Sequence, residues 1–298
     1  MKNIDYKLIE ALNAVISTGS FEKGAMKLCI SQSAISQRIK QLEKYISHPV
    51  LVRESPPRAT KIGHKLLGLL QRVKMLEGDV LPNLNIEETN KAIPIDIATN
   101  ADSLATWLLP SLQDILEKES VEFNFTVLSE QRTLDKLKNG EVIGAISTID
   151  KTIAGCESIF LGYLEYICVS SPKFYQKHFH KGVNNSSLLK APTVTYDEFD
   201  KIHHDFLSEH YNVNDIEIVH KVANSEAFVK LAKMGTAYCL IPVLQIAYEL
   251  KTGELINISS SLRSRYPIYW HHWQLESPKM KRVTNAIVKY ARKELPQG

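Results

Sequence analysis

The chain has 298 residues, of which 44% are hydrophobic and 23% are charged, and its formal net charge is +3. This length allows two or more domains with cores of their own, and the composition is ordinary for a globular protein. The sequence contains no apolar run near the roughly 20 residues of a membrane helix and no signal-peptide core at its start. We therefore expect a cytoplasmic protein with no membrane association.

The small net charge hides an asymmetry along the chain. Residues 1–66 carry 11 basic and 5 acidic side chains, whereas the remainder carries 25 and 28. A basic N-terminal part joined to a mildly acidic body indicates that one end of the protein contacts a polyanion.

The cysteines and histidines give no sign of a metal site. Four cysteines form no CxxC pair and have apolar neighbours, which favours buried free thiols: Cys29, Cys156, Cys168 and Cys239. The adjacent pairs His203-His204 and His271-His272 point in different directions on a helix or strand, so neither pair suits one shared ion. We expect no metal and no cofactor.

The first three elements are predicted to be short helices joined by tight turns. Residues 5–17 place apolar side chains at helical spacing, and Gly19 ends this helix. Ser20 is a good N-cap for the second helix, and Ser31 for the third, which runs over about 32–46. Two short helices and a turn followed by such a helix form the helix-turn-helix plan.

The third helix has two unlike faces. A core stripe at i, i+4, i+7 and i+11 consists of Ile35, Ile39, Leu42 and Ile46. Another face is polar and consists of Ser33, Ser36, Gln37 and Lys40. Small polar side chains allow close approach to DNA, glutamine can pair with adenine, and serine suits several bases. We therefore predict that this face enters the major groove; the alternative is an ordinary solvent-facing surface.

A wing is predicted after the third helix. Residues 50–53 are typical of a short strand, and Pro56-Pro57 stiffens the turn that follows. Arg53 and Arg58 would then contact phosphates or a minor groove. A plain hairpin with exposed arginines is the alternative.

A long helix over residues 61–81 follows, with Thr60 as its cap. Apolar residues step by three and four along it, the coiled-coil period, at Leu66, Leu69, Val73, Leu76 and Val80. We predict that this seam dimerises the chain, because a two-fold dimer would read two DNA half-sites. Packing within one chain is the alternative. Pro82 ends the helix, and the polar residues 87–92 are typical of a linker.

From Ile93 onward strands and helices alternate, which predicts an α/β fold with largely parallel strands. We expect helices over 103–119, 132–140, 199–210, 225–235 and about 278–294. We expect strands over 93–99, 121–128, 142–148, 159–169, 192–195, 216–222, 237–242, 255–259 and 265–273.

Ligands of such folds bind beyond the carboxyl ends of strands, where loops lead into helices. Three loops of this kind cover 99–103, 128–130 and 223–226. Asparagine, serine and free amides at a helix start suit a carboxylate. Negative charge for an ammonium or guanidinium group comes from Asp102, Glu130, Asp197 and Glu226. An amphoteric ligand with a basic side chain fits this mixture. The alternative is that these residues are only helix caps.

No catalytic motif supports an enzyme: GxSxG, GxGxxG after a strand, HExxH and the P-loop are all absent. An amino-acid-binding module without a DNA role would account for residues 93–298 alone. The first 60 residues argue against an α/β enzyme, which would not need them.

Several stretches carry a strong resemblance to LysR-type transcriptional regulators. Residues 31–39 and Leu42-Glu43 look like the recognition helix of that family. Four segments resemble a lysine- and arginine-responsive subgroup of this family, whose members are also described as inhibitors of chromosome initiation. They are FEKGAMKLCISQSAISQRIKQLE, LVRESPPRATKIGHKLL, NADSLATWLLP and NSEAFVKLA. The similarity covers essentially the whole chain. Val50-Leu51 before the wing arginine and the short PPRAT wing depart from the wider family but agree with the subgroup.

The resemblance implies a multidomain α/β protein with three parts. Residues 1–60 would form a winged helix-turn-helix DNA-binding domain, residues 61–90 a dimerising linker helix, and residues 91–298 an effector-binding domain. The last would consist of two α/β subdomains like those of periplasmic binding proteins, with crossing segments near 166–170 and 261–265. The implied assembly is a homodimer or a homotetramer.

The resemblance also implies partners and residues for a sequence-specific transcriptional regulator. Double-stranded DNA would be contacted by Ser31, Gln32, Ser33, Ser36, Gln37, Arg38, Lys40, Arg53 and Arg58. A small-molecule effector, lysine or arginine, would lie between the subdomains near Asn100, Asp102, Ser103, Glu130, Ser147, Asp197, Asn224 and Glu226.

Overall fold

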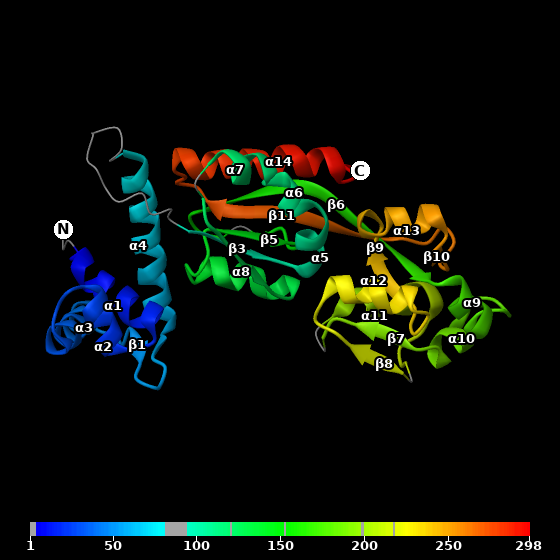
Figure 1. Cartoon of the computed structure of the whole chain (residues 1–298), viewed down its shortest axis with the longest axis horizontal. Helices are drawn as coiled ribbons and strands as arrows, with labels where there is room; N and C mark the ends of the chain where they lie inside the picture. The colour runs from blue at the N-terminus through cyan, green and yellow to red at the C-terminus, as the bar shows by residue number, and fades with distance from the viewer. Residues whose placement is uncertain (1–3, 81–93, 120, 152, 198–199, 217) are drawn as a thin grey trace.

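The computed structural model describes residues 4–80, 94–119, 121–151, 153–197, 200–216 and 218–298. The side chains at 75, 78–80 and 130–131 also lie outside the described part. An N-terminal helical domain, a long helix and an α/β body of two subdomains follow one another (Figure 1). Among the described residues, no helix has both the length and the apolar character needed to cross a bilayer.

The N-terminal domain has the predicted three helices and a small hairpin. Their bounds are α1 (Tyr6–Thr18), α2 (Phe21–Lys27), α3 (Gln32–Ile46), β1 (Leu51–Val52) and β2 (Arg58–Ala59). Gly19 ends α1 with a φ of 67°, and Ser20 and Ser31 cap α2 and α3 by accepting backbone N–H groups. The second helix ends two residues before its predicted end at Cys29, whose φ is 53°.

The three helices pack around a core that fixes the direction of α3. Ile35, Ile39 and Leu42 are fully buried in it. A Cβ at Gly24 would lie 3.0 Å from the backbone nitrogen of Val15, so glycine is what allows α1 and α2 to approach this closely.

The long helix α4 (Lys61–Val80) begins at the predicted cap, because Thr60 Oγ1 accepts the Gly63 N–H at 3.1 Å. Leu66 and Leu70 are buried in the core of the N-terminal domain of the same chain. Packing within one chain therefore occupies part of the predicted seam. The side chain of Val80 lies outside the described part, and dimerisation through α4 stays a prediction.

The body is built on a seven-stranded mixed sheet in the order β10-β6-β11-β5-β3-β4, with β9 also paired to β6. The strands are β3 (Ile95–Thr99), β4 (Phe123–Val127), β5 (Gly144–Ser147), β6 (Cys156–Ser170), β9 (Cys239–Pro242), β10 (Ile256–Asn257) and β11 (Ser264–Trp273). Only β3 with β4 and β3 with β5 are parallel here. The prediction of largely parallel strands is wrong for this sheet, because the two longest strands, β6 and β11, run antiparallel to each other.

Two segments connect the subdomains at the predicted places. Strand β6 pairs with β11 up to Tyr166 and continues into the second subdomain, where it pairs with β9 and β10. The return segment is held at this crossing by Cys168, whose carbonyl accepts the Ile258 N–H at 2.8 Å and whose N–H donates to Ser259 Oγ at 3.2 Å. The second subdomain also contains the parallel pair β7 (Thr193–Thr195) and β8 (Val219–Lys221).

Helices cover both subdomains. Those of the body are α5 (Ala101–Ser103), α6 (Leu109–Ser111), α7 (Gln113–Lys118), α8 (Glu130–Lys138), α9 (Pro172–His178), α10 (Asn185–Lys190), α11 (Lys201–Tyr211), α12 (Ser225–Lys233), α13 (Ala247–Thr252) and α14 (Pro278–Glu294). The prediction of a single helix over 103–119 is wrong. A π-helix, η2 (Leu104–Leu108), separates α5 from α6, and a bend at Leu112 separates α6 from α7. A 3₁₀ turn, η3 (Val243–Gln245), precedes α13. The sequence patterns did not reveal α9, α10 or α13.

Three of the four cysteines are buried free thiols, as predicted: Cys156, Cys168 and Cys239. Burial raises the pKa of Cys156 to about 11. Cys29 is also free but exposed, so the prediction of burial is wrong there. It occupies the turn between α2 and α3, where its apolar sequence neighbours do not enclose it.

Candidate functional site

The first candidate site is the outer face of α3. Its core stripe turns inward, so the polar residues of the other face remain accessible to a partner. Ser31, Gln32, Ser33, Gln37 and Lys40 are exposed, and Ser36 and Arg38 are partly exposed. Ser31 has a structural role as well, since its Oγ accepts the Ala34 N–H at 3.2 Å. The serines therefore both start the helix and leave its first turns free of bulky side chains.

The two arginines of the β1–β2 hairpin are also accessible, and Arg53 lies near Glu43 of this helix. Arg53 lies with its Nη2 3.8 Å from Glu43 Oε2 and its guanidinium 5.9 Å from the Phe21 ring centre. Arg58 donates from Nε to Glu54 Oε1 at 2.5 Å, and its side chain is 74% exposed. Such exposed pairs contribute little to stability, so phosphates could replace the carboxylates at small cost.

The second candidate site is a cavity of about 490 Å³ between the two subdomains. The β3–α5 connection and the start of α8 line it from the first subdomain. The β7–α11 connection and α12 line it from the second subdomain. Tyr166 and Tyr266, on the crossing strands β6 and β11, form an aromatic wall with ring centres 5.7 Å apart.

Asp102 links three elements that line this cavity, α5, α12 and β6. Ser225, at the start of α12 in the second subdomain, donates to its Oδ1 at 2.5 Å. Tyr166 on the crossing strand donates from its hydroxyl to Oδ2 at 2.7 Å. Burial raises the pKa of Asp102, and the two hydrogen bonds oppose this effect without cancelling it. Each carboxylate oxygen can accept a further hydrogen bond, so Asp102 can still bind a cationic group.

Asp200 is a second partly desolvated carboxylate of the cavity. It caps α11, accepting the Ile202 N–H at 3.1 Å, and it accepts the Tyr196 N–H at 2.9 Å. Burial raises its pKa most, and the charge of Asp102 raises it further, although the backbone N–H groups lower it. The two aspartates therefore repel each other across the cavity, and a bound cation would relieve the repulsion.

The cavity as a whole has an excess of acidic side chains. Arg132 and Lys201 are its basic residues, and His203 is held neutral because burial lowers its pKa to about 4. The acidic residues that line it are Asp102, Asp135, Asp197, Asp200 and Asp205.

The structure brings together some of the predicted effector residues and not others. Asn100, Asp102 and Asp197 line the cavity. Ser103 and Ser147 are buried next to lining residues, Ser147 accepting the Ile149 N–H at 3.2 Å. Asn224 caps α12 and Glu226 is exposed, and both lie outside the lining. The side chain of Glu130 falls outside the described part.

Most lining residues were not selected from the sequence, and they include Arg132, Tyr166, Tyr196, Asp200 and Ser225. Asp200 and Ser225 could have been selected from the sequence, since each lies where a strand leads into the start of a helix, as Asp102 does. Tyr166 lies within a long apolar strand, where nothing in the local sequence separates a cavity-facing tyrosine from a core one.

Comparison with known proteins agrees with this architecture. Residues 6–64 match the model of bacterial regulatory helix-turn-helix proteins of the lysR family, and residues 94–292 match the LysR substrate-binding domain. The chain is 53% identical to the HTH-type transcriptional regulator ArgP of Vibrio parahaemolyticus over 298 residues, which is 100% of both chains.

Two solved structures resemble the whole chain. The crystal structure of ArgP from Mycobacterium tuberculosis is 29% identical with a TM-score of 0.88, covering 99% of this chain and 100% of that one. Full-length LysG from Corynebacterium glutamicum, solved with bound effector Arg, is 27% identical with a TM-score of 0.78, covering 98% of this chain and 100% of that one.

Proposed function

We propose that this chain, which belongs to the LysR family of DNA-binding transcriptional regulators, binds lysine or arginine in the cavity between its subdomains and regulates transcription in response. The family is one of regulators and not of enzymes. The observation that carries the effector proposal is the charge of the cavity, where, among the residues that the structure describes, five aspartates face one arginine and one lysine.

Both ends of a basic amino acid find chemical partners in this cavity. Asp102 and Asp200 suit an ammonium or guanidinium group, because a cation offsets their mutual repulsion. Arg132 lines the same cavity and suits the ligand's carboxylate. The arginine bound to LysG supports this assignment, because that protein resembles the chain over nearly its full length.

The DNA contacts are proposed for the outer face of α3 and the hairpin. Exposure of that face supports direct base contacts by Gln32, Ser33, Ser36 and Gln37. Phosphate or minor-groove contacts are assigned to Arg53 and Arg58, and the neighbouring Ser31, Arg38 and Lys40 complete the surface.

The division into residues 1–60, 61–90 and 91–298 is also part of the proposal. The start of α4 at Lys61 supports the first boundary, and the second falls in residues outside the described part. A homodimer or homotetramer in the cytoplasm follows from the need to read paired half-sites on chromosomal DNA.

The effector assignment is tested by calorimetry on the full chain and on Asp102→Asn. Loss of the charged acceptor should weaken arginine and lysine binding by roughly 10- to 100-fold, since a hydrogen bond to a charged group contributes about 1.5–3 kcal/mol. Asp114→Asn, an exposed carboxylate on α7, is the matched control and should bind like the parent. An unchanged dissociation constant for Asp102→Asn would remove this residue from the site.

A further inference from the structure

The linker helix α4 docks on the first subdomain of its own chain. Its Gly68 lies so close to Gly140, after α8, that a Cβ on Gly68 would lie 2.3 Å from the Gly140 carbonyl oxygen. Gln71 donates from Nε2 to Asp96 Oδ2 on β3. One helix turn of α4 is thus held against the start of β3 and the residue that follows the end of α8 by two.

This junction encloses a second cavity of about 550 Å³. Its charge is opposite to that of the effector cavity. In the described part of the chain, the charged residues that line it are Lys65, Arg72, Lys138 and Lys151, against one acid, Asp135. Among the described residues, none of these four cations has a carboxylate within ion-pair distance.

Arg72 is held in this cavity by two contacts with the protein. Its guanidinium carbon lies 3.8 Å from the centre of the Trp273 ring, and its Nε donates to the Gly68 carbonyl at 3.1 Å. The side chain is partly buried, and this burial lowers the pKa of the guanidinium. A cation desolvated in this way without an opposing carboxylate gains from a bound anion.

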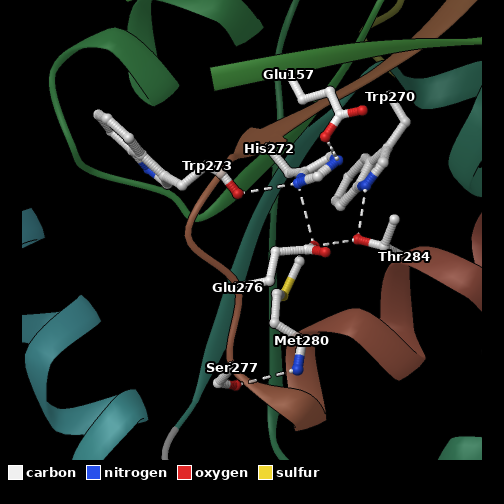
Figure 2. A network of polar contacts seen from close by, with 8 residues as sticks. All are labelled: Glu157, Trp270, His272, Trp273, Glu276, Ser277, Met280 and Thr284. Carbon is white, nitrogen blue, oxygen red and sulfur yellow. Dashed lines mark hydrogen bonds and ion pairs between the residues drawn. The ribbon is translucent and has the colours of Figure 1, made fainter. Parts of the chain in front are cut away.

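Trp273 lies next to a hydrogen-bonded turn that fixes its backbone. It is the last residue of β11, and the preceding His272 hydrogen-bonds through Nδ1 to Glu276 Oε1 at 3.1 Å. Figure 2 shows His272, Glu276 and Thr284 turned toward one another and Trp273 turned away from them. These contacts hold the backbone from which the Trp273 side chain extends toward Arg72.

We propose that this junction is a binding site for a small, multiply charged oxyanion, a phosphoryl or polycarboxylate compound. Four cations against one acid match a ligand with two or more negative charges, and arginine suits both oxyanion types. A DNA duplex is too wide to enter the cavity between α4 and the first subdomain. In addition, α3 lies on the far side of the N-terminal domain from this junction (Figure 1).

The position of the site predicts what occupancy does. The anion would join Lys65 and Arg72 of α4 to Lys138 and Lys151 of the first subdomain, and so hold the linker helix docked. Asp135 and Ile149 line both this cavity and the effector cavity. Binding in one cavity is thereby coupled to the other through shared walls, and such coupling is reciprocal.

The test is calorimetric titration of the full chain with sodium pyrophosphate and, separately, with citrate, at constant ionic strength. We expect one site for at least one of the two, and the better ligand distinguishes phosphoryl from polycarboxylate recognition. The double variant Lys138→Gln/Lys151→Gln should lose at least tenfold in affinity for that ligand, and arginine should still bind in the effector cavity. The matched control, Lys173→Gln/Lys281→Gln, changes two exposed lysines elsewhere and should bind both ligands like the parent.

A second readout uses Trp273, because Trp107 and Trp270 are buried in the core. The anion should change the tryptophan fluorescence of the parent and not that of Trp273→Phe. Equal anion affinity in the double variant and the parent would overturn the proposal, as would binding by neither pyrophosphate nor citrate. Loss of operator affinity in the double variant, with anion affinity unchanged, would assign these lysines to DNA and equally overturn it.

Discussion

At the scale of single residues, Asp102 has opposite effects on stability and on ligand binding. Burial of its carboxylate disfavours the charged form, which is the form that would bind a cationic ligand. Its raised pKa means that the folded, ligand-free protein holds the proton more tightly than the unfolded chain does. The folded state is therefore destabilised as pH rises from the ordinary aspartate pKa through the raised one. The proposed basic ligand would offset this destabilisation, and its binding would then be coupled to the stability of the domain.

Asp102→Asn should accordingly raise the melting temperature of the ligand-free protein at neutral pH, and the gain should shrink toward pH 4. The amide can keep the Tyr166 hydroxyl as a donor to its oxygen. Its N–H₂ can donate to Ser225, whose hydroxyl then turns to Gln245 Oε1 at 3.0 Å. The measurement is thermal unfolding from pH 4 to 7.5.

The control residue for this prediction, Asp114, has its pKa shifted in the opposite direction from that of Asp102. Asp114 has a lowered pKa through its hydrogen bond to Lys118, so Asp114→Asn should not stabilise the protein at any pH. A melting temperature of Asp102→Asn that stays at or below that of the parent throughout would show that Asp102 is not under electrostatic strain.

His272, near the end of β11, makes a pH-dependent contribution to the stability of the folded protein. Burial lowers its pKa, but the hydrogen bond and charge of Glu276, with Glu157 at 4.0 Å, outweigh burial and leave the pKa raised. Its contribution to stability is thus full below the ordinary histidine pKa and is lost as pH rises through the raised one. His272→Gln should lower the melting temperature more at pH 6 than at pH 9. An equal loss at both pH values would show that the imidazole is not protonated in this pair.

Sequence reasoning at the residue scale succeeded where a role is local. Asn100, Asp102 and Asp197 follow strands and could be selected from that position alone. Ser225 lies in a loop that the same rule selects, yet its neighbours Asn224 and Glu226 were chosen instead. Only the packing of α12 on Asp102 decides which of the three faces the cavity.

At the scale of elements, α3 is the most fully predictable part of the molecule. Its N-cap, its buried apolar positions and its polar positions all follow from the spacing of residues in the sequence, and the helix has the predicted bounds. The helix over 103–119 was not predictable in this way, because its π-turn depends on packing and not on spacing. The direction of β6 and β11 likewise depends on contacts between distant parts of the chain.

The polar face of α3 makes a direct prediction about DNA binding. Ser36→Leu places a branched apolar side chain against the groove and should abolish specific operator binding, at a cost of at least about 1–3 kcal/mol per lost base contact. Arginine binding should be unchanged. Gel shifts over a range of salt concentrations measure the effect, and Ser186→Leu, an exposed serine on α10, is the matched control. Parent-like operator affinity in Ser36→Leu would show that this face does not enter the groove.

At the scale of the whole molecule, we propose that the effector acts through the arrangement of the two subdomains. The crossing strands, Asp102 and α12 all meet at the cavity, so a ligand there can favour one arrangement over another. A ligand shifts such an equilibrium only by its difference in affinity for the two states. Because α4 docks on the first subdomain, a change in subdomain arrangement would be passed to the helix that carries the DNA-binding domain.

The most direct measurement is a calorimetric comparison of lysine, arginine and norleucine on the parent protein. Norleucine has the length of lysine without the ammonium group, so it isolates the charge that the five aspartates are proposed to recognise. We predict that lysine or arginine binds at least tenfold more tightly than norleucine. Binding of norleucine as tight as that of both basic amino acids would contradict recognition by the acidic cavity.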